Sequence, residues 1–107
     1  MATKESTVEY IIDQLVDLPD ISTRKMFGEY ALYFGKKVVA LICDDILYVK
    51  ITEQGKEFVG KYYKEGFAYS KAKASMQIDE DLLEDREWLS KLISITEEYL
   101  SEPKKKK

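Results

Sequence analysis

The chain has 107 residues, is 45% hydrophobic and 35% charged, and carries a formal net charge of −3. This length holds one domain with one core, and the apolar fraction together with eight Tyr, four Phe and one Trp excludes an intrinsically disordered protein. Histidine is absent and cysteine occurs once, which excludes an internal disulfide and removes the commonest general base and the usual zinc ligands.

Residues 7–18 are predicted to form an amphipathic helix. Ser6 and Glu9 have the spacing of a capping box, and Pro19 ends the helical pattern. The apolar stripe of this helix consists of Val8, Ile11, Ile12, Leu15, Val16 and Leu18. Acidic residues interrupt the stripe, and no segment of the chain reaches the ~20 apolar residues of a membrane span. We therefore expect a cytoplasmic protein without a signal peptide or a membrane segment.

The next segment, residues 24–51, is predicted to form a three-stranded antiparallel meander that begins at Arg24 and Lys25. Two-residue connections separate the apolar runs 30–34, 37–42 and 46–51, and such short connections force neighbouring strands to be antiparallel. The middle strand is apolar on both alternating faces, so we expect a helix, a loop or a second subunit to cover its second face. Cys43 follows this strand and is interpreted as a small buried hydrophobe.

The remaining residues predict a short helix, two short strands and a final helix. Thr52 caps the short helix, Phe58, Val59, Tyr62 and Tyr63 form its apolar side, and Gly66 ends it. The two strands are expected at residues 67–70 and 75–78. Asp79 or Asp85 caps the final helix, whose shared face consists of Trp88, Leu89, Leu92, Ile93, Thr96, Tyr99 and Leu100.

These elements predict an α+β fold with the order α-β-β-β-α-β-β-α. Helices and strands do not alternate strictly, so we expect an antiparallel five-stranded sheet with helices packed on it rather than a parallel doubly wound sheet. Residues 1–103 are expected to form a single domain, followed by a basic tail at 104–107.

The segment from Arg24 to Tyr33, with the sequence RKMFGEYALY, resembles the signature of the TfoX (Sxy) N-terminal domain family. The resemblance extends over about residues 8–100, and its further matches are Ala40, Leu41, Ile42, Asp44, Leu47, Tyr48, Val49, Lys50, Phe67, Tyr69, Leu82 and Leu83. Glu29 and Ala31 occupy positions where the family commonly has glycine, so a positive φ at either would be strained.

The resemblance implies a mixed fold with an antiparallel sheet, no enzymatic activity, and a role in the regulation of competence genes. Family members with two domains act as transcriptional co-regulators, and this chain corresponds to their N-terminal domain alone. We therefore expect a non-enzymatic regulatory module that acts by protein–protein contact, with the transcription machinery among its expected partners. An enzyme of unknown type is the least favoured alternative.

Charge and aromatic patterns suggest where a partner binds. Residues 21–73 carry ten basic and six acidic residues, whereas both flanking segments are acidic. The candidate partner-binding residues are Arg24, Lys25, Gly28, Tyr30, Lys36, Lys37 and Lys50. A cationic patch of these residues would bind an acidic partner or, as the alternative function, nucleic acid directly. The competing explanation is that edge-strand lysines discourage aggregation and that tyrosines form cross-strand pairs.

No other motif points to chemistry. The acidic residues around Asp79 and Glu84 suit the positive end of a helix dipole and lack the spacing and glycine of a calcium loop. Phosphate-binding loops and nucleophile motifs are missing from the sequence. We expect no cofactor and no metal, and we expect the second apolar face of the middle strand to support a homodimer.

Overall fold

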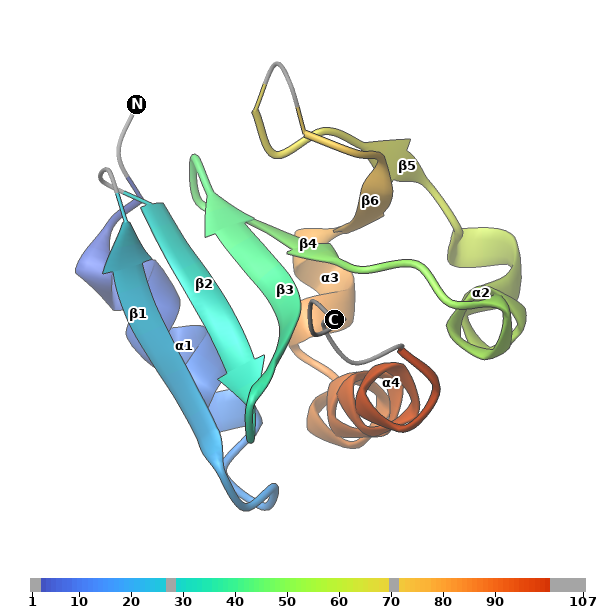
Figure 1. Cartoon of the computed structure of the whole chain (residues 1–107), viewed down its shortest axis with the longest axis horizontal. Helices are drawn as coiled ribbons and strands as arrows, with labels where there is room; N and C mark the ends of the chain where they lie inside the picture. Colours follow the sequence, from blue (N-terminus) through green and yellow to red (C-terminus); the bar gives the residue numbers. More distant parts are fainter. Residues whose placement is uncertain (1–2, 27–28, 70–71, 101–107) are drawn as a thin grey trace, which may run out of the picture.

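A computed structural model describes residues 3–26, 29–69 and 72–100, and Figure 1 shows its elements. The helices are α1 (Glu5–Gln14), α2 (Glu53–Val59), α3 (Glu80–Leu83) and α4 (Arg86–Tyr99), and a 3-10 turn, η1 (Gly60–Tyr62), follows α2. The strands are β1 (Ile21–Met26), β2 (Glu29–Phe34), β3 (Lys37–Cys43), β4 (Ile46–Val49), β5 (Glu65–Gly66) and β6 (Ser75–Ile78).

The strands form one antiparallel sheet with the spatial order β1-β2-β3-β4-β6-β5. This confirms the α+β class and the antiparallel sheet, but the predicted number of five strands is wrong. The additional strand is β1, which was predicted as part of the same strand as β2. Its residues are largely exposed and polar, and it lacks the apolar alternation by which a half-buried strand is recognised.

Both predicted two-residue turns are present. Gly35, after β2, has φ +64°, and Asp44 and Asp45, after β3, have φ 54° and 64°. Aspartate tolerates the left-handed region better than most residues, which suits the turn of a tight hairpin. The Asp45 carboxylate accepts hydrogen bonds from the Lys4 amide and the Thr7 hydroxyl, both at 2.9 Å, and these bonds lower the pKa of Asp45. The turn therefore holds the start of α1.

Helix α1 begins and ends earlier than the sequence predicts. It occupies Glu5–Gln14 rather than residues 7–18, with Lys4 at the N-cap position and no side-chain capping bond. The prediction that Ser6 and Glu9 form a capping box is therefore wrong. Long-range hydrogen bonds from the first turn to the β3–β4 turn replaced the local cap, and the chain leaves the helix five residues before Pro19.

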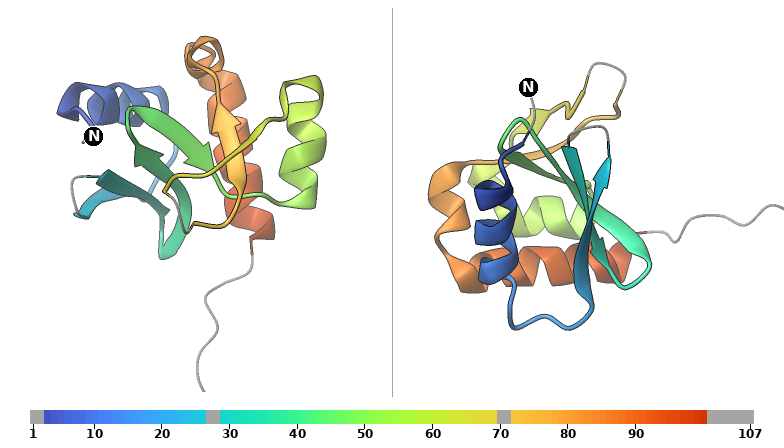
Figure 2. Two further views of the ribbon diagram at one scale, coloured as in Figure 1. Left: turned by 90° about the horizontal axis from the view of Figure 1, so that it is seen from above. Right: turned by 90° about the vertical axis from the view of Figure 1, so that its left-hand side faces the viewer.

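The helices lie on one side of the sheet, as the right-hand view of Figure 2 shows for β1–β3. They enclose a core to which the sheet and the helices both contribute. Its fully buried large side chains include Ile11 of α1, Leu32, Ile42 and Leu47 of the sheet, and Leu89, Leu92 and Ile93 of α4. Within the described ranges, no helix has the length and apolar character needed to cross a bilayer.

Local capping defines the helices of the second half. Thr52 caps α2 as predicted, but the helix ends at Gly60, with φ +58°, and not at Gly66. The Asp85 carboxylate accepts a hydrogen bond from the Trp88 amide at 3.1 Å, which confirms Asp85 as the cap of the final helix. The alternative cap, Asp79, precedes the separate helix α3 and makes no side-chain capping bond.

The prediction of a strand at residues 67–70 is also wrong for residues 67–69, which are the part of this segment that the structure describes. The pairing of β5 with β6 ends at Gly66. Phe67 and Tyr69 follow β5 outside any strand and are 59% and 60% exposed. These aromatic side chains suggested a strand, but they lie on the protein surface.

Replacing Thr52 by alanine is expected to lower the free energy of unfolding by about 1 kcal/mol. The Thr52 hydroxyl accepts the Gly55 amide at 2.9 Å inside the protein, where water does not replace it. Urea denaturation of the variant measures the loss, and Thr52→Ser is the matched control because it keeps the accepting oxygen. Equal destabilisation by both variants would contradict the capping role.

Candidate interaction surface

One face of the sheet, which we call the open face, points away from the helices and the core. The strand register places five residues in one row across it: Arg24 opposite Ala31, Ala31 opposite Leu41, Leu41 opposite Tyr48, and Tyr48 opposite Gln77. Directly opposite residues share one face of an antiparallel sheet. Ala31, Leu41 and Tyr48 do not belong to the core cluster, whereas their neighbours along the strands do.

Tyr48 is only 7% exposed although it lies on the open face. A Cβ atom at Gly66 would lie 3.1 Å from Cε1 of Tyr48 and 2.6 Å from Oε1 of Gln77. Glycine at this position therefore lets β5 approach the Tyr48 ring closely. This contact covers one end of the open face. At the other end, over β1–β3, Arg24 and Met26 are exposed and Leu41 is half-buried, whereas Ala31 and Cys43 are buried.

The end over β1–β3 contains a groove of about 410 Å³, which we call the open-face groove. It is lined by Met26, Glu29, Tyr30, Leu41, Cys43 and Tyr69. These residues come from three neighbouring strands and from the segment after β5. Met26 is 41% exposed and Tyr69 60% exposed, so the groove has large, accessible apolar walls. Such a concave apolar surface is typical of binding sites.

Glu29 supplies the polar edge of the groove. Its carboxylate accepts hydrogen bonds from the Thr3 hydroxyl and, at 3.1 Å, from the Asp44 amide. These bonds hold the side chain between the N-terminal segment and the β3–β4 turn. Ala31 has φ outside the left-handed region, so alanine in place of the family's glycine introduces no backbone strain at this position.

Cys43 lies at the base of the groove and is 4% exposed. Burial, followed by the negative charges of Glu29 and Asp44, raises the pKa of its thiol. The thiol therefore stays protonated near neutral pH, which makes it a poor nucleophile. The interpretation of Cys43 as a buried hydrophobe is confirmed. Among the residues that the structure describes, no group of three potential metal ligands occurs.

The predicted partner-binding residues do not share one surface. Arg24 lies on the open face, where its guanidinium carbon is 5.8 Å from the centre of the Tyr33 ring. Lys25 is opposite Tyr30 and so faces the helix side of the sheet, although it is exposed at the edge. Tyr30 itself is 8% exposed and belongs to the core cluster. Gly28 lies outside the described residues.

The three remaining lysines are dispersed. Lys36 is exposed in the β2–β3 turn, and Lys50 is half-buried after β4. The Lys37 ammonium donates a hydrogen bond to the Glu97 carbonyl at 2.5 Å and lies 3.9 Å from the Glu97 carboxylate. Lys37 thus connects the start of β3 to the last turn of α4, which is a structural role.

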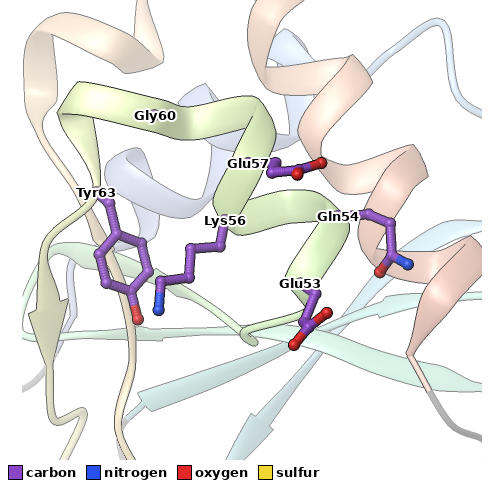
Figure 3. Close-up of a pocket in the computed structure, with 6 residues that line it drawn as sticks. All are labelled: Glu53, Gln54, Lys56, Glu57, Gly60 and Tyr63. Atoms are coloured by element: carbon purple, nitrogen blue, oxygen red, sulfur yellow. The ribbon is translucent and has the colours of Figure 1, made fainter.

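A second, larger hollow of about 690 Å³ lies beside α2 (Figure 3). It is lined by Glu53, Gln54, Lys56, Glu57, Gly60 and Tyr63. The Lys56 ammonium is 4.9 Å from the centre of the Tyr63 ring, while Gln54 and Glu57 point away from this pair. These side chains do not converge on a common point. The hollow therefore has fewer features of a binding site than the open-face groove.

Tyr63 gives a pH-dependent test of the geometry beside α2. Its hydroxyl donates to the Glu65 carboxylate at 2.6 Å, and this bond, with some desolvation, raises the pKa of Tyr63 to about 12. The hydrogen bond favours the neutral phenol in the folded state. It therefore stabilises the folded protein fully below about pH 10, and this stabilisation is lost as the pH rises through the folded-state pKa of about 12.

Ultraviolet difference titration of the wild type against Tyr63→Phe is expected to show one phenol that ionises near pH 12. In Glu65→Gln the same phenol is expected to ionise at a lower pH, because the charged acceptor is gone. An unchanged titration in Glu65→Gln would contradict the hydrogen bond.

Sequence reasoning did not identify the groove. The doubly apolar middle strand correctly indicated that its second face is partly covered, and Leu41 and Cys43 are on that face. The sequence did not indicate that Met26 and Tyr69 lie together, because the register of β1 and the path of the chain after β5 bring them to one groove. Of the predicted partner-binding residues, Tyr30 is among those that line the groove, and Arg24 lies on the open face outside its lining.

Two comparisons with known proteins give a consistent result. The sequence profile of the TfoX N-terminal domain matches residues 13–99. An uncharacterised 12.7 kDa protein in the trpE 5′ region of Spirochaeta aurantia is 34% identical over 107 residues, which cover 100% of this chain and 91% of that protein.

Proposed function

The chain belongs to the TfoX N-terminal domain family, and from this membership we propose that it is a non-enzymatic regulatory module that binds a protein through the open-face groove. The family has a competence-related regulatory character, and we place this chain in the same kind of role. The transcription machinery is the expected class of partner, and the cytoplasm the expected compartment.

The observation that carries the proposal is the groove of about 410 Å³ with its exposed apolar walls. Met26 and Tyr69 expose large apolar side chains next to the half-buried Leu41. Protein interfaces are typically built around such pockets, which take an apolar anchor residue and are surrounded by polar groups. Glu29 supplies such a polar group in the groove lining, and Arg24 lies on the same face of β1 as Met26, outside that lining.

The proposed partner therefore presents an aliphatic or aromatic side chain to the groove. The Arg24 guanidinium, held against the Tyr33 ring, favours an acidic group beside that anchor. The acidic group beside the apolar anchor makes the contact specific, because an apolar side chain alone would bind to any apolar surface.

Affinity purification with two matched tyrosine variants tests the proposal. Tyr69→Ala removes one wall of the groove, whereas Tyr62→Ala removes a similarly exposed tyrosine, 49% exposed, from η1. A specific partner is expected with the wild type and Tyr62→Ala, and is expected to be lost with Tyr69→Ala. The partner is then purified and titrated against the three proteins.

The expected loss of affinity with Tyr69→Ala is at least tenfold, which corresponds to about 1.4 kcal/mol. Equal binding to Tyr69→Ala and the wild type would refute the groove as the site. Recovery of chaperones and abundant background proteins alone would count against a protein-binding role altogether.

Direct nucleic-acid binding is the second candidate, supported by the Arg24–Tyr33 arrangement on an accessible face. The structural use of Lys37 weakens it, because one predicted phosphate ligand is already bound to α4. Fluorescence anisotropy with single-stranded and duplex DNA at ~50 mM salt favours such contacts. A flat titration there would eliminate this candidate.

A further inference from the structure

The edge of the sheet at β1 provides a second surface, separate from the open-face groove. Among the residues that the structure describes, β1 pairs only with β2 and forms one edge of the sheet (Figure 1). Four of its six residues are exposed. An edge strand of this length presents unpaired backbone groups that another strand can use.

The hydrogen-bond phase identifies which backbone groups of β1 point outward. The Gly35 amide donates to the Asp20 carbonyl at 2.9 Å, so this pair is hydrogen-bonded. Hydrogen-bonded and non-hydrogen-bonded pairs alternate along an antiparallel ladder. With the register of β1 and β2, the outward-facing amides and carbonyls belong to Ile21, Thr23 and Lys25.

The side chains of the same three residues face the helix side of the sheet, where a hollow of about 390 Å³ lies between α1 and the start of β1. Its apolar lining includes Ile12, Val16, Leu18 and Ile21, and Glu9 and Asp13 are also at its rim. The Asp13 carboxylate is 3.4 Å from the Arg86 guanidinium, whereas Glu9 has no ion-pair partner among the described residues. An apolar stem that ends in a positive charge would fit this hollow.

We propose that a second copy of this chain pairs antiparallel along β1, with Thr23 opposite Thr23 of the second copy at a two-fold axis. This register places Lys25 of one copy opposite Ile21 of the other. The aliphatic stem of Lys25 from one copy then covers the hollow of the other copy, and the Lys25 ammonium reaches the Glu9 carboxylate of that other copy. The strand is therefore complementary to itself in both shape and charge.

Neighbouring registers are less favourable. A two-fold axis at Arg24 would place the two guanidinium groups directly opposite each other, and like charges in opposed positions are destabilising. An axis at Ser22 would bring Lys25 opposite Pro19, which is beyond the strand. The register centred on Thr23 places Arg24 opposite Ser22, so the two guanidinium groups are diagonal neighbours and not directly opposite, and it places Lys25 opposite the uncharged Ile21.

The dimer has a consequence for the open face. Continuing the sheet across a two-fold axis keeps the open faces of both copies on one side, so the dimer presents two open-face grooves in the same direction. The pairing does not depend on what the grooves bind, and it is tested without a partner.

Sedimentation velocity of the full chain over a range of concentrations tests the dimer. The wild type is expected to change from monomer to dimer as concentration rises. Thr23→Pro is expected to stay monomeric, because it removes an outward amide and leaves the pairing with β2 intact. Circular dichroism checks that this variant is folded.

Charge variants test the register even if Thr23→Pro does not fold. Lys25→Glu is expected to weaken the dimer at least tenfold, which corresponds to about 1.4 kcal/mol. Combining it with Glu9→Lys is expected to restore dimerisation, because the two charges exchange places across the interface. Lys36→Glu, the same charge change in the β2–β3 turn, is the control and is expected to behave as the wild type.

A wild type that remains monomeric at every concentration would overturn the proposal, as would a dimer that neither Thr23→Pro nor Lys25→Glu weakens. A Glu9→Lys, Lys25→Glu double variant that dimerises no better than Lys25→Glu alone would refute this register.

Discussion

Replacing Leu92 by alanine is expected to lower the free energy of unfolding by about 2–5 kcal/mol. Leu92 is 0% exposed and belongs to the core cluster. Its Cδ1 atom lies 3.5 Å from the place where a Cβ atom of Gly55 would stand, so it fills the space between α4 and α2. The shorter side chain leaves a cavity that neighbouring helices and strands cannot fully close.

Urea denaturation measures this loss, and Lys91→Ala is the matched control on the same helix. Lys91 is exposed, so its replacement is expected to change the free energy of unfolding by no more than about 0.5 kcal/mol. Similar effects of the two substitutions would show that α4 does not pack on the sheet as described.

Replacing Lys37 by alanine is expected to cost about 1–3 kcal/mol of stability, while replacing its neighbour Lys36 has almost no effect. The Lys37 side chain is 13% exposed and donates to the Glu97 carbonyl. A positive charge that binds a carbonyl at the end of a helix also suits the helix dipole. Denaturation of the two single variants measures the difference.

Salt separates the two interactions of Lys37. The Glu97 carboxylate is 38% exposed and 3.9 Å away, so the ion pair contributes little and is screened. The bond to the carbonyl is short and persists, so the destabilisation by Lys37→Ala is expected to remain in high salt. Glu97→Gln keeps the carbonyl and is expected to be nearly neutral. A loss that disappears in high salt would assign the role to the ion pair instead.

The parts of the fold that the sequence predicted have a strong local cause. Gly35 and the Asp44-Asp45 pair specify tight turns almost independently of their surroundings, so β2, β3 and β4 were placed closely. The Thr52 cap has the same local origin, because the hydroxyl and the Gly55 amide are three residues apart.

The parts that failed depend on contacts between distant residues. The start of α1 is determined by the β3–β4 turn, which binds Thr7 and Lys4 through Asp45. β1 has too few apolar residues to be recognised, because an edge strand can leave both its faces polar. Tyr69 suggested a strand since aromatic residues favour strands, yet it lies on the surface beside the groove.

The candidate site shows the same division. Leu41 and Cys43 could be placed on the second face of β3 from alternation alone. Placing Met26 and Tyr69 beside them requires the pairing of β1 with β2 and the path of the chain after β5. The cationic patch that was predicted from the sequence therefore combined residues from both faces of the sheet. One of these residues, Lys37, has a structural role, because it binds the Glu97 carbonyl.

Photo-cross-linking in the cell tests most directly whether the open-face groove is the site of contact. A photoreactive phenylalanine is introduced at Tyr69 in one variant and at Tyr62 in the other, because both positions are exposed aromatics on the same domain. We expect a discrete adduct with one protein from Tyr69 and none from Tyr62. Adducts of equal yield at both positions, or at Tyr62 alone, would contradict recognition through this groove.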